Sequence, residues 1–343
     1  MFIKEFDYDL PKELIAQQPT ARREDSRMMV VRRREGTIEH ARFSDFPARM
    51  SEGDVLVLND TRVIPARVWG KAGQADVEFL FVRELGPGLW EALCRPARKI
   101  RDGERIVFAP GIDAVVAGEG AEGLRTLRFG RPDVLSVLRE VGYAPLPPYI
   151  KRPKGREDLR SRDLERYQTV FARKDGAIAA PTAGLHFTPL VLSAVRKRRV
   201  DVRKITLEVG VATFQPVRVA RVEEHRMLEE RYEVPSAAAR AINFAKSEGR
   251  PVTAVGTTVV RTLESAYRDG EVRAEKGSTT LFIHPGYEFK VVDRLLTNFH
   301  LPKSTLLMLV SAFAGTDLIR HAYREAVRER YRFFSYGDCM LIL

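Results

Sequence analysis

The segment 180–188 reads APTAGLHFT and combines one imidazole with two hydroxyl side chains and almost no bulk. Its Pro and Gly restrict the backbone to a tight path, as in loops that cradle a ligand. His186 stands between two apolar neighbours, and because an imidazole titrates near neutral pH it is a candidate for proton transfer. The alternative is a tight connector in which His186 hydrogen-bonds to a polar group of the core.

A second polar segment, Gly256-Thr257-Thr258, follows the apolar run 251–255 and opens a helix that we expect to end at Asp269-Gly270. Free N–H groups and hydroxyls at a helix start can hold a phosphate, a carboxylate or ribose oxygens, and Arg261 adds a positive charge. The alternative is an ordinary cap, with Arg261 and Glu264 paired on the helix surface. The segment lacks the spacing of a P-loop or of a dinucleotide-binding fingerprint.

Two further polar segments come from opposite ends of the chain. Residues 59–62, with the sequence NDTR, follow an apolar strand expected at 55–58, and residues 297–302, with the sequence TNFHLP, precede an apolar helix expected at 304–314. A loop attached to a buried helix holds its side chains in a narrow geometry, which favours chemistry there. The alternatives are an Asx turn at residues 59 and 60 and a hydrogen-bonded, buried His300.

The elements around these segments alternate between strand and helix in the second half of the chain. A strand that ends at 178–180 is followed by the loop, by a helix that starts with Thr188 and Pro189, and by a strand at 200–210. This alternation predicts an α/β sheet, in which ligands bind at the carboxyl ends of the strands. The polar loop at 180–188 falls at such a position.

Residues 66–129 have a different pattern. Short β-type runs separated by Gly, Pro and Asp turns predict an all-β module, a small barrel. These runs are 67–69, 77–82, 89–94, 105–108, 114–117 and 124–129. A short helix is expected at 133–141, followed by a stiff, Pro-rich linker at 142–149.

Composition limits the class of protein. The chain of 343 residues has a net charge of +11, and such a positive field favours a polyanion, with nucleic acid as the leading partner. Its length fits about two domains. Cys94 and Cys339 are far apart in sequence and outside any metal-ligand spacing, so neither a disulfide framework nor a zinc site is expected. Without a leader-type or membrane-spanning run, we expect a soluble, cytoplasmic protein.

Several sequence blocks occur in the order found in a known family. They are residues 6–11, 14–17, 59–63, 166–170, 180–188, 256–258, 297–302 and 331–338. From its first residues to its last, the chain resembles the S-adenosylmethionine:tRNA ribosyltransferase-isomerases of the queuosine pathway. The resemblance implies that the ribosyl moiety of S-adenosylmethionine is transferred to 7-aminomethyl-7-deazaguanine (preQ1) at the tRNA wobble position and isomerised to an epoxycyclopentanediol. The implied products are epoxyqueuosine-tRNA, adenine and methionine.

The implied reaction assigns candidate roles to several side chains. It needs a base that removes a proton beside the sulfonium, a donor that helps adenine leave, and the neutral amine of the modified base as nucleophile. The acid/base candidates are His186, His225 and His300. Asp60 and Glu264 are candidates for balancing the sulfonium or holding the ribose. The rings that could face the sulfonium or stack on adenine are Phe187, Phe214 and Phe299.

The four polar segments are expected to form one ribosyl-transfer pocket with residues 180–188 at its centre. The remaining substrate-binding candidates are Asn59, Thr61, Arg62, Thr182, Ala183, Gly184, Glu208, Gly210, Gly256, Thr257, Thr258, Arg261, Thr297 and Asn298. The implied chemistry requires no metal and no bound cofactor, since S-adenosylmethionine is a substrate.

Two histidines that are usual in the family are replaced in this chain. Glu208-Val209-Gly210 stands where the family has His-Val-Gly, and His225-Arg226-Met227-Leu228 stands where it has His-x-Met-His. Leu228 cannot take part in proton chemistry, so we interpret that histidine as inessential. Whether Glu208 takes over a hydrogen-bonding or base role stays open. The family's Gly-Thr-Thr-Ser ends here in Val259, so no role is expected for a fourth hydroxyl.

The resemblance also implies the architecture and the partner. An α/β domain with a barrel-like mixed sheet and helices would comprise residues 1–65 and 150–343, with an antiparallel β-barrel inserted at 66–149. The partner would be tRNA carrying preQ1, bound by a monomer. The basic candidates for the RNA face are Arg95, Arg98, Lys99, Arg101, Lys151, Arg152, Lys154 and Arg156.

Two other classes of function fit part of the pattern. A tRNA methyltransferase would also use S-adenosylmethionine and a basic surface. The chain, however, lacks a glycine-rich loop after a first strand with an acidic residue about twenty positions later. A non-catalytic RNA-binding protein would explain the charge and the barrel, but not four polar segments drawn from distant parts of the chain.

Overall fold

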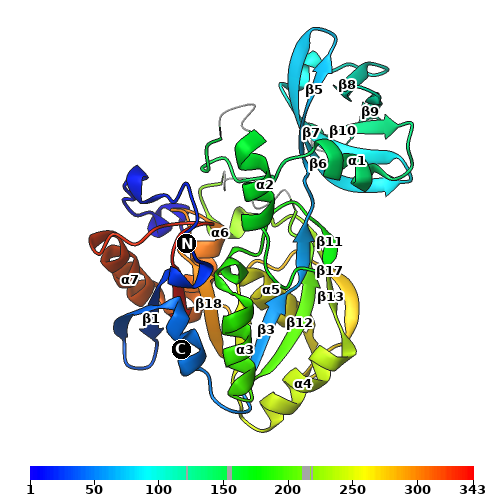
Figure 1. The fold of residues 1–343 in the computed structure, drawn as a ribbon. Helices are drawn as coiled ribbons and strands as arrows, with labels where there is room; N and C mark the ends of the chain where they lie inside the picture. The colour runs from blue at the N-terminus through cyan, green and yellow to red at the C-terminus, as the bar shows by residue number, and fades with distance from the viewer. Residues whose placement is uncertain (121–122, 153–156, 211–216, 218) are drawn as a thin grey trace.

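Nine of the described strands form one mixed sheet, in the order β17-β13-β12-β3-β14-β18-β19-β1-β2 (Figure 1). The computed structural model describes residues 1–120, 123–152, 157–210, 217 and 219–343. The strands are β1 (Arg27–Arg32), β2 (Thr37–Arg42), β3 (Val55–Asn59), β12 (Asp201–Leu207), β13 (Glu230–Val234), β14 (Val252–Val255), β17 (Glu275–Thr279), β18 (Arg294–Asn298) and β19 (Cys339–Ile342). Both ends of the sequence therefore contribute to the same sheet.

The centre of this sheet is parallel. Strands β12, β3, β14 and β18 are neighbours that run in the same direction, whereas β19 is antiparallel to β18. The carboxyl ends of parallel strands lie at the same edge of a sheet. The segments that follow β3, β14 and β18 therefore meet at one edge, although more than two hundred positions, from Asn59 to Asn298, separate them in the sequence.

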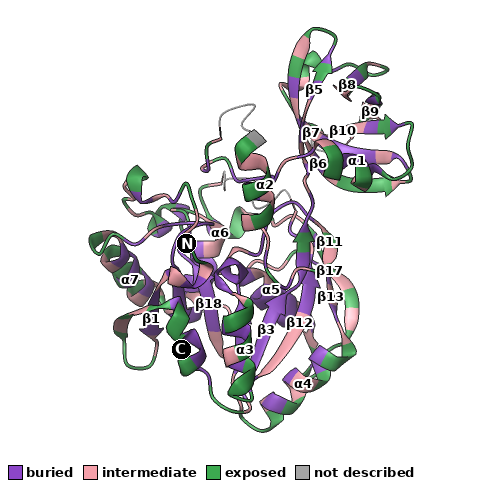
Figure 2. Cartoon of the chain, in the orientation of Figure 1, coloured by how far each residue is buried: buried purple, intermediate pink, exposed green. Residues whose placement is uncertain are grey.

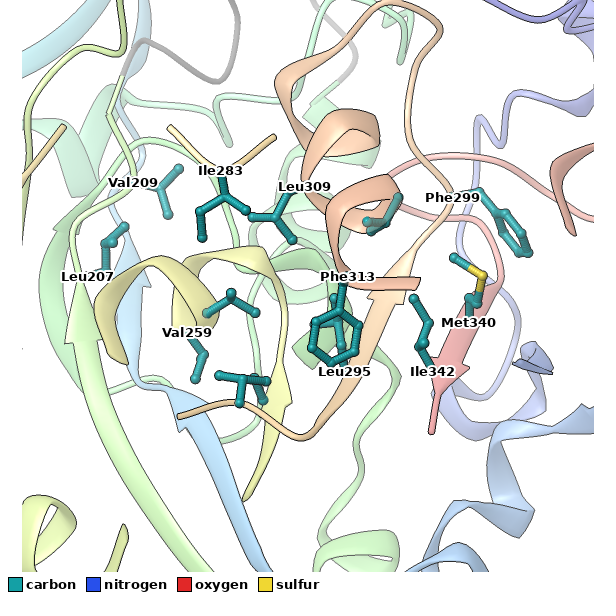
Figure 3. Packing of buried hydrophobic residues seen from close by; sticks show 14 of the residues in the cluster. Leu207, Val209, Val259, Ile283, Leu295, Phe299, Leu309, Phe313, Met340 and Ile342 are labelled. Atoms are coloured by element: carbon teal, nitrogen blue, oxygen red, sulfur yellow. The ribbon is translucent and has the colours of Figure 1, made fainter. Parts of the chain in front are cut away.

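Helices cover both faces of the sheet, as the alternation along β3 shows. Leu56 and Leu58 belong to a buried cluster with α3 (Pro189–Lys197). Val55 and Val57 belong to the opposite cluster (Figure 3). That cluster includes residues of α4 (Ser236–Ser247), α5 (Thr257–Ser265), α6 (Thr305–Ala314) and α7 (Thr316–Arg328). Successive side chains of a strand point to opposite faces, so a strand buried on both faces is apolar throughout.

The inserted module is a closed antiparallel barrel in the order β10-β7-β6-β5-β8-β9. Its strands are β5 (Arg67–Ala72), β6 (Ala75–Gly86), β7 (Leu89–Arg95), β8 (Arg105–Ala109), β9 (Ile112–Glu119) and β10 (Arg125–Phe129), followed by α1 (Val134–Val141). Phe79, Phe81, Trp90 and Leu127 fill its core. In Figure 2 the barrel stands apart from the large sheet, and each of the two has buried segments of its own.

The expected combination of a mixed α/β domain and an antiparallel barrel is confirmed. The large sheet has two edge strands, β17 and β2, whereas the barrel closes on itself. The barrel strands and α1 fall within 66–149, but the domain boundaries themselves stay a prediction. Among the described residues, no helix is both long enough and apolar enough to cross a bilayer.

Caps and turns set the ends of the helices near the polar segments. The hydroxyls of Thr188 and Ser304 accept the N–H groups of Val191 and Leu307, at 3.3 and 3.2 Å, so α3 and α6 begin where the sequence predicts.

The predicted end of α5 is wrong. The helix ends at Ser265, and Asp269-Gly270 forms the turn of a hairpin between β15 (Tyr267–Arg268) and β16 (Glu271–Val272). Both turn residues have positive φ, of 53° and 87°, which suits a two-residue hairpin turn.

Short elements join the two modules. Strands β4 (Thr61–Val63) and β11 (Lys174–Ala177) form a parallel pair, and α2 (Glu157–Arg166) precedes β11. The strand before the polar loop ends at Ala177, slightly earlier than the expected 178–180. It pairs with β4 outside the nine-stranded sheet, so the prediction that the loop 180–188 follows a strand of the large α/β sheet is wrong.

Candidate active site at the strand ends

Asn59 ties together three elements at the carboxyl edge of the sheet. Its amide nitrogen donates to the carbonyl oxygen of Leu207 at 3.1 Å and to the hydroxyl of Thr258 at 3.3 Å. Its amide oxygen accepts the N–H groups of Thr61 and Leu207 at 3.1 and 3.0 Å. All four hydrogen-bonding positions of this buried side chain are used, so Asn59 fixes the ends of β3 and β12 against α5. An Asx-type contact to Thr61 is thus only part of its role.

Asp60 is a buried carboxylate with two partners that the sequence did not reveal. Its oxygens accept a hydrogen bond from the hydroxyl of Thr206 at 2.7 Å and from Nε of Arg173 at 3.1 Å. The side chain of Asp60 is 1% exposed, whereas that of Arg173 is 64% exposed. Arg62, the neighbouring candidate, is exposed and donates to the carbonyl oxygen of Ala172.

His186 closes the short 3-10 helix η7 (Thr182–His186) and is buried. Its Nε2 lies 3.3 Å from the amide nitrogen of Asn298, which also donates to the carbonyl oxygen of Phe334. An amide nitrogen only donates, so Nε2 accepts, and the ring proton resides on Nδ1. Nδ1 in turn lies 2.9 Å from the hydroxyl of Ser26, which acts as its acceptor.

Burial keeps His186 neutral. Desolvation lowers the pKa of His186 to about 4, the Arg23 and Arg332 charges act in the same direction, and the hydrogen bond with Asn298 opposes them. At neutral pH the ring is therefore a proton acceptor or a hydrogen-bond donor, and not a cationic acid.

His300 is the second imidazole near the end of β18. Its Nε2 lies 2.9 Å from the hydroxyl of Thr297, and its backbone N–H donates to the hydroxyl of Tyr323 at 2.9 Å. Burial lowers the pKa of His300 to about 3, so this ring is also neutral at pH 7. These contacts agree with the predicted alternative, in which His300 is a buried, hydrogen-bonded imidazole.

Close backbone approaches bring the loop 180–188 to the strand ends. A Cβ at Gly184 would lie 2.8 Å from the ring of Phe171, so only glycine fits there. Gly256 has a φ of +89°, and a Cβ on it would lie 3.7 Å from that of Ala183. The segments 180–188 and 256–258 are therefore neighbours, as the proposed pocket requires. Thr182 starts η7, and Thr257 is buried in the first turn of α5.

Arg261 and Glu264 are both buried, and each has partners outside α5, so the predicted alternative of a helix-surface pair is wrong. Arg261 forms an ion pair with Glu230 and donates through Nε to the carbonyl oxygen of Leu281 at 3.0 Å. Glu264 accepts four hydrogen bonds at 2.9 to 3.3 Å, from the N–H groups of Lys290, Val291 and Val292 and from the hydroxyl of Tyr287. Glu264 therefore anchors the segment 287–292.

The aromatic candidates are enclosed by other rings. Phe187 packs edge-on against Phe43 with ring centres 4.9 Å apart. Phe299 lies within 5.5 Å of three aromatic rings and belongs to the cluster in Figure 3. Both side chains are fully buried, which argues against the expected contacts with the sulfonium or adenine. Phe214 lies outside the described residues.

The remaining candidates lie on segments after β12. His225 contacts the ring of Phe282, with centres 5.1 Å apart, and burial lowers its pKa. Glu208 packs against Gly176, where a Cβ would lie 3.2 Å from its carboxyl carbon. Gly210 donates its N–H to Glu230 at 3.2 Å. None of these contacts joins the three residues to His186 or His300.

Several buried polar atoms at the site have no hydrogen-bond partner among the described residues. They are the hydroxyl of Thr61, one terminal nitrogen of Arg261 and the amide oxygen of Asn298. Buried polar groups normally have partners, so these atoms are available to a ligand. In the same part of the chain, no group of three or more His, Cys, Asp or Glu side chains has a metal-binding arrangement.

The candidate RNA face is exposed on the barrel. Arg95, Arg98, Lys99 and Arg101 are all exposed, and the second and third lie on a 3-10 turn. Arg152, by contrast, forms a two-pronged ion pair with Asp163 at 2.7 and 3.0 Å, so its guanidinium group is not free for RNA. Lys151 is exposed, and Lys154 and Arg156 lie outside the described residues.

Comparison of the sequence with known proteins identifies the family. A family model described as a queuosine biosynthesis protein matches residues 3–342. The chain belongs to this family. Its members include proteins named S-adenosylmethionine:tRNA ribosyltransferase-isomerase from Thermotoga maritima, 48% identical over 344 residues, and Symbiobacterium thermophilum, 52% identical over 348 residues. Each alignment covers 100% of both chains.

A solved structure of the family has the same overall fold. The crystal structure of an S-adenosylmethionine tRNA ribosyltransferase from Thermotoga maritima aligns with a TM-score of 0.56 and 39% identity. The alignment covers 99% of this chain and 100% of that one. The likeness thus includes both the α/β domain and the barrel.

Proposed function

We propose that this protein transfers and isomerises the ribosyl moiety of S-adenosylmethionine onto preQ1 at the wobble position of tRNA. The products are epoxyqueuosine-tRNA, adenine and methionine. One observation carries the proposal: over its full length, the chain is about 50% identical to enzymes whose name gives this activity. The Symbiobacterium thermophilum protein, for example, is 52% identical. The enzyme would act as a cytoplasmic monomer. Neither a methyltransferase nor a non-catalytic RNA-binding protein is favoured.

The groups at the strand-end site support this proposal. A neutral imidazole can accept the proton removed beside the sulfonium, and His186 and His300 are both neutral at pH 7 because they are buried. The carboxylate of Asp60, held by Thr206 and Arg173, places negative charge near the end of β3. The unpaired hydroxyl of Thr61 is a candidate donor to the ribose.

The test of the reaction is incubation of the purified protein with S-adenosylmethionine and preQ1-containing tRNA. We expect free adenine and a nucleoside whose mass matches epoxyqueuosine. Methyl addition to the tRNA would instead identify a methyltransferase. Binding of the tRNA without adenine release would leave only an RNA-binding protein, and either outcome would overturn the proposal.

The identity of the base is tested by substitution of each histidine. His186, His225 and His300 are each replaced by Ala, and the rate of adenine release is measured. A histidine whose replacement leaves this rate unchanged is not the base. His321 on α7 is exposed and serves as the control substitution. For a general base we expect a loss of about 100-fold or more. A loss in the His186→Ala variant that His186→Gln restores would indicate a hydrogen-bonding role for His186.

A further inference from the structure

A small pocket borders His186 on the side formed by the two ends of the chain. Its lining includes Arg23, Ser26, Arg166, Ser335 and Tyr336. The cavity volume is about 20 Å³. A space of this size holds about one water-sized group, such as a single carboxylate oxygen, and not a nucleobase. Residues 166–170 and 331–338 belong to the family blocks, yet the strand-end site gives them no role.

Two arginines bring positive charge to this pocket. Their guanidinium groups donate at 2.8 to 3.2 Å to backbone carbonyl oxygens of Thr20, Ala21, Glu165 and Leu185. Among the described residues, neither Arg23 nor Arg166 forms an ion pair with a carboxylate. Burial lowers the pKa of Arg23, and the nearby charge of Arg166 lowers it further. The negative charge of the exposed Glu165 carboxylate raises this pKa and so opposes both effects. The two cations are thus fixed close together.

Tyr336 adds an unused hydrogen-bonding group. Its side chain is 4% exposed, and its hydroxyl has no hydrogen-bond partner among the described residues. A buried hydroxyl without a partner is unfavourable, so its retention at the pocket points to a ligand atom. The neighbouring Ser335 already shares a hydrogen bond of 2.7 Å with Tyr149.

Two carboxylates near the pocket are engaged by other groups. Asp163 is held by the two-pronged ion pair with Arg152. Asp338 accepts the backbone N–H groups of Arg27 and Arg332 at 2.9 and 2.8 Å. Neither acid neutralises the two pocket arginines through a direct contact. A small anion would supply the missing negative charge.

We propose that this pocket binds the carboxylate of the amino-acid part of S-adenosylmethionine, with Arg23, Arg166 and Tyr336 as donors. The inference rests on the proposed function, which supplies the substrate. Arginine recognises a carboxylate through hydrogen bonds to its oxygens, and one carboxylate oxygen has about the size of the water that the pocket can hold. An RNA phosphate presents similar oxygens, and measurement of tRNA binding distinguishes the two ligands. The position beside His186 leaves the sulfonium and ribose to point toward the strand ends.

The test compares the binding of S-adenosylmethionine with that of decarboxylated S-adenosylmethionine, by calorimetry. The wild-type protein should prefer the carboxylated ligand by about 10- to 100-fold, the range expected for hydrogen bonds to a charged group. Arg166→Gln and Tyr336→Phe should weaken S-adenosylmethionine binding by about 10-fold and about 3-fold, and leave binding of the decarboxylated ligand unchanged. Arg162→Gln is the matched control, since Arg162 is exposed on the same helix and does not line the pocket.

Three outcomes would overturn the inference. Wild-type protein could bind both ligands equally. The Tyr336→Phe variant, which keeps the size and burial of the ring, could weaken both ligands alike, indicating a structural role. Loss of tRNA binding with unchanged S-adenosylmethionine binding would assign the pocket to an RNA phosphate. Failure of the proposed function has a different signature, because the wild-type protein would then release no adenine in the presence of preQ1-containing tRNA.

Discussion

The amide nitrogen of Asn298 lies 3.3 Å from Nε2 of His186, so the end of β18 is hydrogen-bonded to the loop that carries the imidazole. The same amide nitrogen donates to the carbonyl oxygen of Phe334, which fixes its orientation. The contact therefore determines both the position and the tautomer of His186. The side chain of Asn298 thus joins the segments of His186 and Phe334, which lie 112 and 36 positions away in the sequence.

Replacement of Asn298 by Asp should raise the pKa of His186. A carboxylate at this distance stabilises the protonated ring, and an adjacent opposite charge typically shifts a pKa by about 1 to 3 units. The pKa of about 4 in the wild-type protein should therefore move toward the neutral range. NMR titration of the ring protons measures the shift, with the resonance of the exposed His321 as internal control. An unchanged pKa would mean that the two side chains are not in contact.

Mild acid should destabilise the fold through the two buried imidazoles. An unfolded histidine titrates near pH 6.5, whereas the folded pKa values of His186 and His300 are about 4 and about 3. Below pH 6.5 the unfolded chain binds more protons, so the free energy of unfolding falls by about 1.4 kcal/mol per pH unit for each histidine, down to about pH 4. Above pH 6.5 this contribution is constant.

Urea unfolding between pH 7 and pH 5 checks this slope. The variants His186→Gln and His300→Gln should each show a shallower dependence on pH than the wild-type protein. The variant His321→Gln, at an exposed position on α7, should keep the wild-type slope. Equal slopes for all four proteins would contradict the assignment of buried, neutral rings.

Loss of Arg173 should destabilise the carboxyl edge of the sheet. The Arg173→Ala variant leaves the buried carboxylate of Asp60 with the Thr206 hydroxyl as its remaining side-chain donor. We expect the free energy of unfolding to fall by about 1 to 2 kcal/mol, because Arg173 is itself largely exposed. Arg62→Ala removes a nearby exposed arginine and should cost about 0.5 kcal/mol or less. If Arg173→Ala lowered the free energy of unfolding by no more than Arg62→Ala does, solvent would be replacing the ion pair with Asp60.

Replacement of Glu264 by Gln should affect stability and not substrate affinity. The new amide nitrogen would face N–H or O–H donors that now point at a carboxylate oxygen. We expect a loss of about 2 to 3 kcal/mol in the free energy of unfolding, with an unchanged KM for S-adenosylmethionine below the melting temperature. Glu271→Gln, at an exposed position, is the control. A raised KM with normal stability would instead support a direct contact with the substrate.

Charge reversal on the barrel tests the RNA face. The double variant Arg98→Glu, Lys99→Glu changes two exposed cations and should weaken tRNA binding, with a slope of log K against log salt that is smaller by about 2. The matched double variant Arg196→Glu, Lys197→Glu changes two adjacent exposed cations on α3. Equal effects of the two variants would indicate a general charge effect and no barrel-specific RNA contact.

The sequence predicted most of the local structure that surrounds the site. Apolar runs with flanking turns predicted the barrel strands, and Thr188 and Ser304 predicted the starts of α3 and α6, because capping depends on residues a few positions apart. Strand and helix alternation predicted an α/β sheet with polar loops at strand ends. Such features follow from local backbone chemistry.

Only the tertiary structure decided which polar side chains are available to a ligand and which already have hydrogen-bond or ion-pair partners within the protein. Arg261 and Glu264 could have formed a pair on the surface of α5. The carboxylate of Glu264 instead accepts hydrogen bonds from the segment 287–292, and Arg261 pairs with Glu230 of β13. Phe187 and Phe299 are enclosed by rings from distant segments. Partners at such sequence separations leave no local pattern, and burial, which sets the pKa of each histidine, depends on the whole packed chain.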